Sequence, residues 1–230
     1  MSEKIMKNKL ITAILGIALS VLILTVSIGL PIYVRPFYYV QIDTLNLVER
    51  TGYSYEVIKE AYDEVLDFCT IPWCEFGTGE LRWSDEGASH FADCKGLFLL
   101  NGGALLVSLG IVVALLILNK KGVIELERPF GFDVSFFSGL GLLSVFTLLA
   151  VLVSLDFNSA FVIFHSLLFP GKDNWLFDPR TDQIINVMPT QFFMNCAILI
   201  ASSIIICSLV FVVLGIVGKH RRIIGIKLKK

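Results

Sequence analysis

The chain has 230 residues, of which 55% are hydrophobic and 17% charged, and its formal net charge at pH 7 is −1. Together with a mean hydropathy of +0.76, this composition excludes a soluble globular domain and predicts an integral membrane protein. Its only concentrated basic run is a short tail, so nucleic acid is not expected as a partner.

Four apolar stretches are long enough to cross a bilayer as helices, which takes roughly 20 residues. They are Leu10–Ile32, Leu97–Leu118, Val134–Leu155 and Phe192–Val217, and none has an Asp, Glu, Lys or Arg in its interior. The first follows several lysines, as a secretory signal does, but it is too long for one and no cleavage site follows it. We therefore expect an all-α membrane protein with four transmembrane helices, the first of them an uncleaved anchor.

Basic residues indicate how these helices are oriented, because they collect on the cytoplasmic side. They precede the first stretch, separate the second from the third, and follow the fourth: Lys4, Lys7, Lys9, Lys120, Lys121, Arg128, Lys219, Arg221, Arg222, Lys227, Lys229 and Lys230. With four spans, all three clusters fall on one side, so both termini are predicted to be cytoplasmic and the tail to contact anionic lipid headgroups. Segments 33–96 and 156–191, both rich in acidic residues, then face the outside.

Segment 33–96 is predicted to form a small extracytoplasmic cap between the first and second transmembrane helices, within a single membrane domain covering residues 1–230. Ser54 is a favourable N-cap for a helix over 55–68, with Glu56 in its first turn. The apolar positions that recur at helical spacing are Ile58, Tyr62, Val65 and Cys69. We expect this apolar face to lie on the membrane or on the transmembrane helices.

The end of the cap leads directly into the second apolar stretch. Ser84 or Asp85 is suited to begin a helix that carries His90 to the outer end of that stretch. On such a helix His90 and Cys94, one turn apart, share a face. Of the other outer cysteines, Cys69 and Cys74 are close enough in sequence to form a disulfide, but whether they do stays open.

The second outer segment, 156–191, contains an unusual apolar run, Phe161–Gly171. It is too apolar for a solvated loop and too short to span a bilayer, so we predict an interfacial segment at headgroup depth, with His165 inside it. Further along, Thr181-Asp182 is expected to cap a short piece that runs up to Pro189, which suits the first turn of the last span.

His90 and His165 are two of only three histidines, and both are predicted at the outer ends of spans. An imidazole exchanges protons near neutral pH, and polar groups at the edge of hydrocarbon favour a functional role. Two imidazoles can divide general acid and general base work between them. The surrounding aromatic residues suit interfacial anchoring and would also form an apolar chamber for acyl chains; the substrate-binding candidates among them are Phe91, Phe164, Phe169 and Trp175.

Two alternatives use Cys94. In the first alternative, Cys94, His90 and His165 are three ligands of a metal ion. The spacing of residues fixes no fourth ligand, so we expect no metal. In the second alternative, Cys94 forms a nucleophile pair with His90. The sequence has no serine-hydrolase motif of the GxSxG type and no CxxC motif.

The run His90-Phe91-Ala92-Asp93-Cys94-Lys95 resembles the His-aromatic-x-Asp-x-Lys segment of the bacterial lipoprotein intramolecular transacylases. A second stretch, from His165 to Gly171 and on through Asn174-Trp175, Asp178-Pro179, Asp182 and Pro189, resembles another segment of the same family. The resemblance extends over essentially the whole chain, with its four spans and outer cap. Cys94 departs from the family pattern, in which we expect an aliphatic residue.

The resemblance implies that His90 and His165 are catalytic. It implies an acyltransferase of the bacterial cell membrane, with an extracytoplasmic active site, that moves an acyl chain from the S-diacylglyceryl group of a lipoprotein to the α-amine of its N-terminal cysteine. The product is a lyso-form N-acyl lipoprotein. We expect membrane lipids as partners, a monomer, and no cofactor.

Asp93, Asn174 and Asp182 are candidates to orient the two imidazoles. The alternative function is a non-enzymatic membrane sensor whose acidic cap binds a cationic partner, with the histidines as structural or pH-sensing groups.

Overall fold

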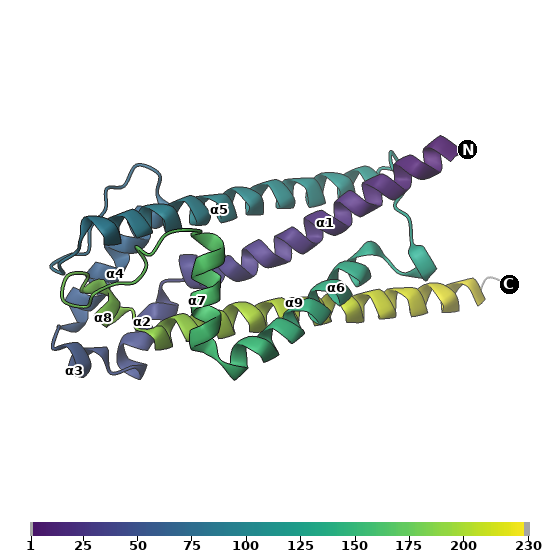
Figure 1. The fold of residues 1–230 in the computed structure, drawn as a ribbon. Coiled ribbons are helices and arrows are strands. Elements are labelled where there is room, and N and C mark those ends of the chain that lie inside the picture. Colours follow the sequence, from purple (N-terminus) through teal and green to yellow (C-terminus); the bar gives the residue numbers. More distant parts are fainter. Residues whose placement is uncertain (1, 228–230) are drawn as a thin grey trace. The chain divides into compact units, whose positions relative to one another are not determined.

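The computed structural model describes residues 2–227, and every regular element among them is helical (Figure 1). The long helices are α1 (Ser2–Tyr33), α5 (Asp85–Lys120), α6 (Val134–Leu155) and α9 (Thr190–Lys227). The shorter ones are α2 (Pro36–Thr44), α3 (Leu47–Thr51), α4 (Tyr55–Thr70), a 3-10 turn (Pro129–Gly131), α7 (Phe157–Leu168) and α8 (Ile184–Val187). The predicted basic residues Lys229 and Lys230 lie outside the described residues.

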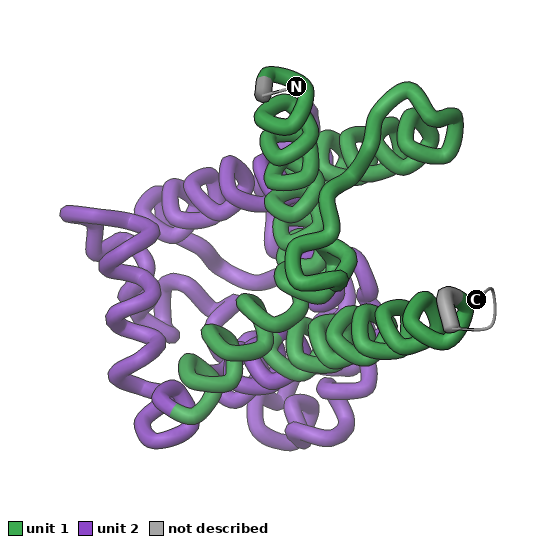
Figure 2. The backbone as a smooth tube through the Cα atoms, turned by 90° about the vertical axis from the view of Figure 1, so that its right-hand side faces the viewer, with its two compact units in different colours: residues 1–27, 103–151, 201–230 green, residues 28–102, 152–200 purple. Residues whose placement is uncertain are grey.

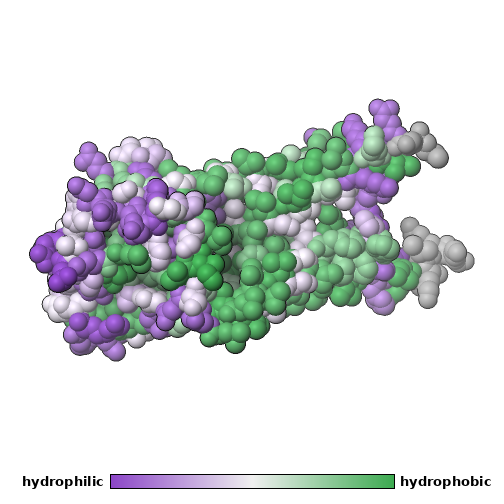
Figure 3. All heavy atoms as spheres, viewed as in Figure 1, coloured by the Kyte–Doolittle hydropathy of each residue, from purple (hydrophilic) through white to green (hydrophobic). Residues whose placement is uncertain are grey.

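The four long helices are each long and apolar enough to cross a membrane, which confirms the predicted fold class. The bounds of α6 coincide with the third predicted span, whereas α1, α5 and α9 extend beyond their apolar stretches. Many large side chains on these helices are exposed and apolar, among them Leu106, Leu148 and Leu214. On the face shown in Figure 3, hydrophobic side chains cover the long helices and hydrophilic ones gather over the short outer elements.

The chain divides into two compact units (Figure 2). The span unit takes the described residues of Met1–Ser27, Gly103–Val151 and Ala201–Lys230. The cap unit takes Ile28–Gly102 and Leu152–Ile200, and therefore contains both predicted outer segments together with the adjoining helix ends.

Small residues let the helices of the span unit approach closely. A Cβ added at Gly139 of α6 would come within 2.7 Å of the Ser208 carbonyl of α9, and one at Gly215 of α9 within 2.6 Å of the Phe136 Cβ. Hydroxyl groups add hydrogen bonds between these helices. Ser138 of α6 donates to the Gly16 carbonyl of α1 at 2.9 Å. Within lipid, helices gain little from the hydrophobic effect when they associate. Close packing at glycine and hydrogen bonds from serine hydroxyls hold them together instead.

The core of the cap unit is built around α4. Ser54 caps this helix as predicted, accepting a hydrogen bond from the Val57 backbone at 3.3 Å. The predicted apolar face is buried, and besides α2 it contacts the ends of α1, α5 and α9 that belong to the cap unit, which agrees with the predicted packing on the transmembrane helices. Tyr62 stacks on Tyr38 of α2 at 3.7 Å between ring centroids, and Phe192 of α9 meets Tyr62 edge-on. This core gives the outer elements a rigid base.

An ionic network fastens the beginning of α2 to α4. Arg35 donates to Asp63 at 3.0 Å and to Asp67, while Lys59 and Tyr39 also donate to Asp63. Burial alone would raise the pKa of Asp63, but these hydrogen bonds and the Arg35 charge outweigh it, so its pKa lies below the ordinary value. The cap is therefore held by charge pairs on its outside and by aromatic packing within.

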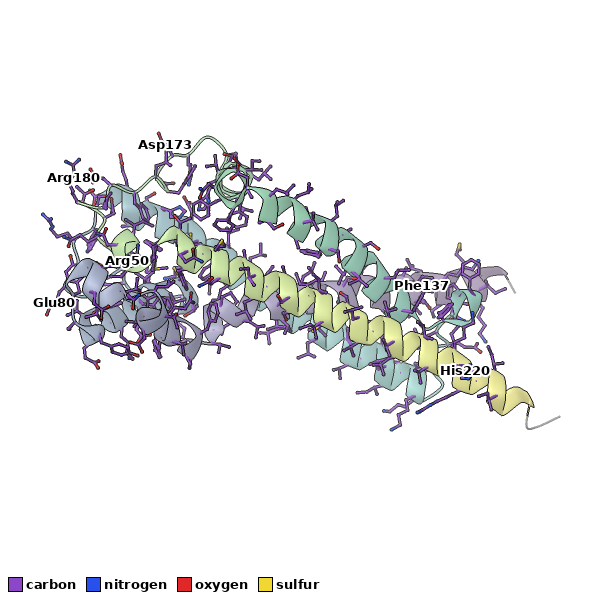
Figure 4. All side chains as sticks on the ribbon, turned by 90° about the horizontal axis from the view of Figure 1, so that it is seen from below. Arg50, Glu80, Phe137, Asp173, Arg180 and His220 are labelled. Carbon is purple, nitrogen blue, oxygen red and sulfur yellow. The ribbon has the colours of Figure 1, made fainter. Side chains whose placement is uncertain are left out.

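The second outer segment contains a helix where an interfacial segment was predicted. The helix, α7, begins at Phe157 because Asp156 accepts from the Ser159 backbone at 3.0 Å. In both Figure 1 and Figure 4, α7 runs crosswise to α5 and α9. Ile163 and Leu167 are exposed while His165 is buried, so one face is apolar and open. This amphipathic helix fits the predicted interfacial position, which stays a prediction.

All five cysteines are free thiols. Cys69 is buried in the cap core, where its thiol contacts the Phe91 carbonyl at 3.7 Å, and burial raises its pKa. The disulfide with Cys74 that the spacing left open is therefore not formed in this structure.

Candidate active site

His90 and His165 meet within the cap unit, although they are 75 positions apart in the chain. Their ring centroids are 5.9 Å apart, and the two side chains are 6% and 8% exposed. His90 comes from the second turn of α5, which runs without a break from its capped start at Ser84 into the apolar stretch. His165 comes from the last turn of α7. The two imidazoles selected from the sequence are thus neighbours in the structure.

The backbone of α7 determines which nitrogen of His165 is available. Its Nδ1 lies 2.8 Å from the Phe161 carbonyl, one turn earlier on the helix. A carbonyl only accepts hydrogen bonds, so Nδ1 carries the proton and Nε2 keeps a lone pair. Burial lowers the pKa of His165, and the bond to Phe161 offsets part of that effect. His165 is therefore a neutral imidazole at physiological pH, with a basic Nε2.

The two ring nitrogens of His90 also differ in their surroundings. Its Nε2 lies 3.5 Å from the Cys94 thiol, as the shared helix face predicted. Its Nδ1 is buried and has no partner among residues 2–227. Phe169 and Phe177 pack edge-on against the ring, with centroids 4.9 and 5.5 Å away. A buried polar nitrogen without a partner is costly, and it suits a group that a bound molecule completes.

Asp93 and Asn174 lie beside the histidines but do not orient either ring directly. Asp93 binds the Lys172 ammonium at 2.6 and 2.7 Å, and it accepts from the Asn174 amide nitrogen at 3.3 Å. Trp175 follows Asn174, donates to the Lys172 carbonyl at 3.1 Å, and stacks on His165 with centroids 4.6 Å apart. These contacts fix the loop after α7 on α5, and through Trp175 they also support the position of His165.

Asp182 orients a helix rather than an imidazole. Its buried carboxylate accepts from the Ser84 backbone and hydroxyl at 2.9 Å, while Ser84 in turn caps α5. A Cβ at Gly87 would collide with this carboxylate, so glycine is required there. The expectation that Asp182 caps the short helix α8 is also corrected, since Gln183 occupies that N-cap position. Asp182 thus sets the start of the helix that carries His90.

The four predicted chamber residues occupy different places. Phe169 is buried against both imidazoles, 4.9 Å from the His90 centroid and 5.9 Å from that of His165. Trp175 stacks on His165, and Phe164 meets it edge-on while remaining 55% exposed. Phe91 instead packs into the cap core, with its ring stacked on Phe76. Their roles in substrate binding stay predictions.

Two further residues from the surrounding aromatic group lie at the site, although they were not among the substrate-binding candidates. Phe161 provides both the carbonyl that fixes His165 and a ring 4.1 Å from its centroid. Phe177 packs on His90 and Phe91. The position of Phe161, four residues before His165, is a sequence signal for the first contact, but only if the segment is known to be helical.

The arrangement does not support the metal alternative. No group of three or more His, Cys, Asp or Glu side chains that could hold a metal ion occurs in the part of the chain that the structure describes. His90, Cys94 and His165 therefore do not form the ligand set considered from sequence. Two neighbouring buried imidazoles in an aromatic enclosure are suited to proton transfer.

The fold and this site define a multi-pass membrane protein in which two buried histidines are neighbours. The family model described as lipoprotein intramolecular transacylase Lit matches residues 13–193, most of the chain and both histidines. The chain therefore belongs to the lipoprotein intramolecular transacylase family and is an acyltransferase. The non-enzymatic alternative is not favoured.

Solved structures agree with this assignment. The membrane integral lipoprotein intramolecular transacylase Lit from Bacillus cereus is 25% identical over 96% of this chain and 97% of that chain, with a TM-score of 0.81. Variants of the Bacillus cereus protein in which a histidine is replaced by arginine or by alanine are 24% identical, with TM-scores of 0.75 and 0.73. They cover 94% of this chain, and 93% and 94% of those chains. No sequence among the curated proteins matches the chain.

Proposed function

We propose that the chain transfers an acyl chain within a diacylglyceryl-modified lipoprotein. The acyl group leaves a glycerol oxygen and joins the free α-amine of the N-terminal cysteine, which gives an N-acyl, monoacylglyceryl lyso-form. The observation that carries the proposal is the pair of buried imidazoles with centroids 5.9 Å apart. Membership of the transacylase family supports the same reaction.

The reaction needs an enclosure more than a covalent enzyme intermediate. When the amine attacks the middle ester, nitrogen, Cα, Cβ, sulfur, two glycerol carbons, oxygen and the carbonyl carbon close a ring of about eight members, which is entropically unfavourable in a free lipid. Phe169, Trp175 and Phe177 surround the histidines and offer an apolar surface on which the lipid headgroup folds back. Holding the amine next to the ester removes most of that entropic cost.

The hydrogen bonds of the two rings suggest how the histidines divide the work. The neutral amine attacks the ester carbonyl, and Nε2 of His165 takes its proton as the nitrogen–carbon bond forms. His90, with the Cys94 thiol beside its Nε2, presents Nδ1 as an N–H donor to the oxyanion. The carbon–oxygen bond then breaks, and the glycerol alkoxide receives the proton held by His165. No water or other reactant is consumed, and both rings return to the neutral state.

The same proposal assigns the site to the outer side of a bacterial cell membrane. The basic clusters support cytoplasmic termini, which leaves the cap unit and its histidines outside. The open apolar face of α7 supports a position at the membrane interface, where the acyl chains of the substrate enter from the lipid. A monomer contains both histidines and so suffices for the reaction.

The decisive experiment is mass spectrometry of the N-terminal peptide of a reporter lipoprotein after incubation with the purified protein. The N-acyl, monoacylglyceryl peptide is expected with the unaltered chain and not with His165→Ala or His90→Ala. The third histidine, His220, provides a matched control, since it lies on α9 in the span unit (Figure 4) and His220→Ala should leave the product unchanged. Undiminished product from His165→Ala would contradict the proposal.

A further inference from the structure

A second buried polar atom has no partner among the described residues, and it belongs to the residue before Trp175, whose ring stacks on His165. It is Oδ1 of Asn174, on the loop between α7 and α8. The amide nitrogen of the same side chain binds Asp93 at 3.3 Å and lies 3.5 Å from the Ser89 hydroxyl, so Asn174 contacts α5 on either side of His90. Its neighbour Trp175 stacks on His165. Asn174 is therefore held between the elements that present the two imidazoles.

The orientation of the Asn174 amide follows from Asp93. Were the amide turned over, Oδ1 would face the Asp93 carboxylate and two acceptors would oppose each other. The nitrogen must therefore face Asp93, which leaves Oδ1 as a fixed acceptor. A buried amide oxygen in this position is stabilised only when a donor reaches it. An N–H or O–H group of a bound molecule would satisfy this acceptor.

The charges around Asn174 indicate which kind of donor fits. Asp93 already binds the Lys172 ammonium at 2.6 Å, so its negative charge is compensated within the cluster. A free carboxylate at this place would stabilise a substrate ammonium ion, which is not nucleophilic. An amide oxygen accepts an N–H without adding a charge, and it therefore binds an amine in the neutral form that attacks an ester.

We propose that Asn174 Oδ1 accepts an N–H from the α-amine of the lipoprotein substrate and so positions the attacking nitrogen between the two histidines. The inference rests on the proposed function, because it names the group that this site holds. Asn174 is thus a substrate-positioning residue, and Asp93 and Lys172 hold it in place.

Binding of unreactive ligands tests this inference separately from catalysis. The probes are two dialkyl ether lipopeptides, which contain no ester to transfer: one has the α-amine, and the other has hydrogen in its place. Binding to the purified full chain is measured at pH 9, where an amine with an ordinary pKa of about 8 is mostly neutral. We expect the unaltered chain to bind the amine-bearing ligand about fivefold more tightly than the des-amino one.

Asn174→Ala should bring that ratio close to one while leaving affinity for the des-amino ligand unchanged, which also shows that the variant is folded. Asn186→Ala is a matched control, since Asn186 is an amide of the same unit whose side chain donates to the Pro179 carbonyl at 2.9 Å, and it should keep the ratio. If Asn174→Ala binds neither ligand, Asn174→Ser, which retains a hydroxyl donor towards Asp93, is judged by the same ratio.

A ratio that is equal in the unaltered chain and in the Asn174 variants would overturn the inference. That result leaves the proposed function standing if acyl transfer by the unaltered chain is observed. Absence of transfer by the unaltered chain would instead contradict the proposed function, whatever the ligands show.

Discussion

At the scale of single residues, the neighbours of each imidazole distinguish two side chains that are chemically the same. The Phe161 carbonyl binds Nδ1 of His165 and leaves Nε2 as a base. The Cys94 thiol lies beside Nε2 of His90, and the buried Nδ1 has no partner among the described residues. Two equivalent groups thereby become suited to different steps, because a hydrogen bond at one ring nitrogen determines the chemistry of the other.

Replacing Cys94 distinguishes a mechanism that uses the two imidazoles from one in which the Cys94 thiol is the nucleophile. A thiol is a weak hydrogen-bond donor, so Cys94→Val should remove only a minor contact with His90 and leave the rate of transfer within about threefold of that of the unaltered chain. The rate is measured by mass spectrometry of the same reporter peptide. A loss of more than about a hundredfold, with the thermal unfolding temperature unchanged, would point to Cys94 as a nucleophile.

The lowered pKa of His165 makes stability depend on pH in a defined direction. As pH falls through the ordinary histidine value of about 6.5, the unfolded chain binds a proton at this residue more readily than the folded chain does. Stability contributed by neutral His165 is therefore complete above that pH and is lost below it. Between pH 7.5 and 5.5, the thermal unfolding temperature of the unaltered chain should fall more steeply than that of His165→Gln. Parallel curves would show that His165 does not titrate in this way.

At the scale of elements, the start of α5 determines the position of His90. Asp182→Ala removes the acceptor for both the Ser84 backbone and hydroxyl, and the free energy of unfolding should fall by about 1–3 kcal/mol. The rate of transfer should fall as well, because the first turns of α5 carry His90. Thermal unfolding and the transfer assay measure the two effects.

Two variants control for the loss of charge at Asp182. Asp182→Asn keeps one acceptor oxygen and should recover much of the stability. Asp178→Ala removes a nearby carboxylate that pairs with exposed Arg180, and it should change neither stability nor rate. Equal effects of Asp182→Ala and Asp178→Ala would contradict the positioning role of Asp182.

Local patterns in the sequence predicted several elements correctly. The starts of α4 and α5 were predictable because Ser54 and Ser84 cap the residues directly after them. The pair of His90 and Cys94 followed from helical spacing alone. Contacts between distant segments were not predictable in this way: Asp182 and Ser84 are 98 positions apart, and no periodicity relates them. The start of α7 was not predicted, because the helix begins before the apolar run Phe161–Gly171 and its N-cap, Asp156, lies outside that run.

The site shows the same limit. Composition and the family resemblance selected His90 and His165, and the structure brings them together. The residues that fix the rings were harder to predict, because the Phe161 contact uses a backbone carbonyl, which every residue has. Asp93 and Asn174 were selected as polar neighbours of the histidines, yet their hydrogen bonds join them to each other and to Lys172. Side-chain identity alone does not determine such partners.

At the scale of the whole molecule, the charge distribution predicts an orientation in the membrane. Lysines and arginines flank the spans on the side of the 121–128 connection, whereas acidic residues dominate the two segments of the cap unit. The positive-inside tendency therefore predicts that the cap unit and its histidines lie outside the cell. For a lipoprotein substrate anchored in the outer leaflet, this is also the side on which the α-amine is exposed.

Cysteine labelling in intact cells tests this orientation. Cys74 is replaced by serine to remove a partly exposed thiol, and a new cysteine is introduced at exposed Glu80 of the cap unit (Figure 4) or at exposed Lys121, after α5. Glu80→Cys should react with a membrane-impermeant maleimide in intact cells, and Lys121→Cys only after the membrane is permeabilised. Because the two positions lie at opposite ends of one span, a single orientation cannot expose both. The reverse pattern would place the histidines in the cytoplasm, and a substrate presented outside the cell would then be out of their reach.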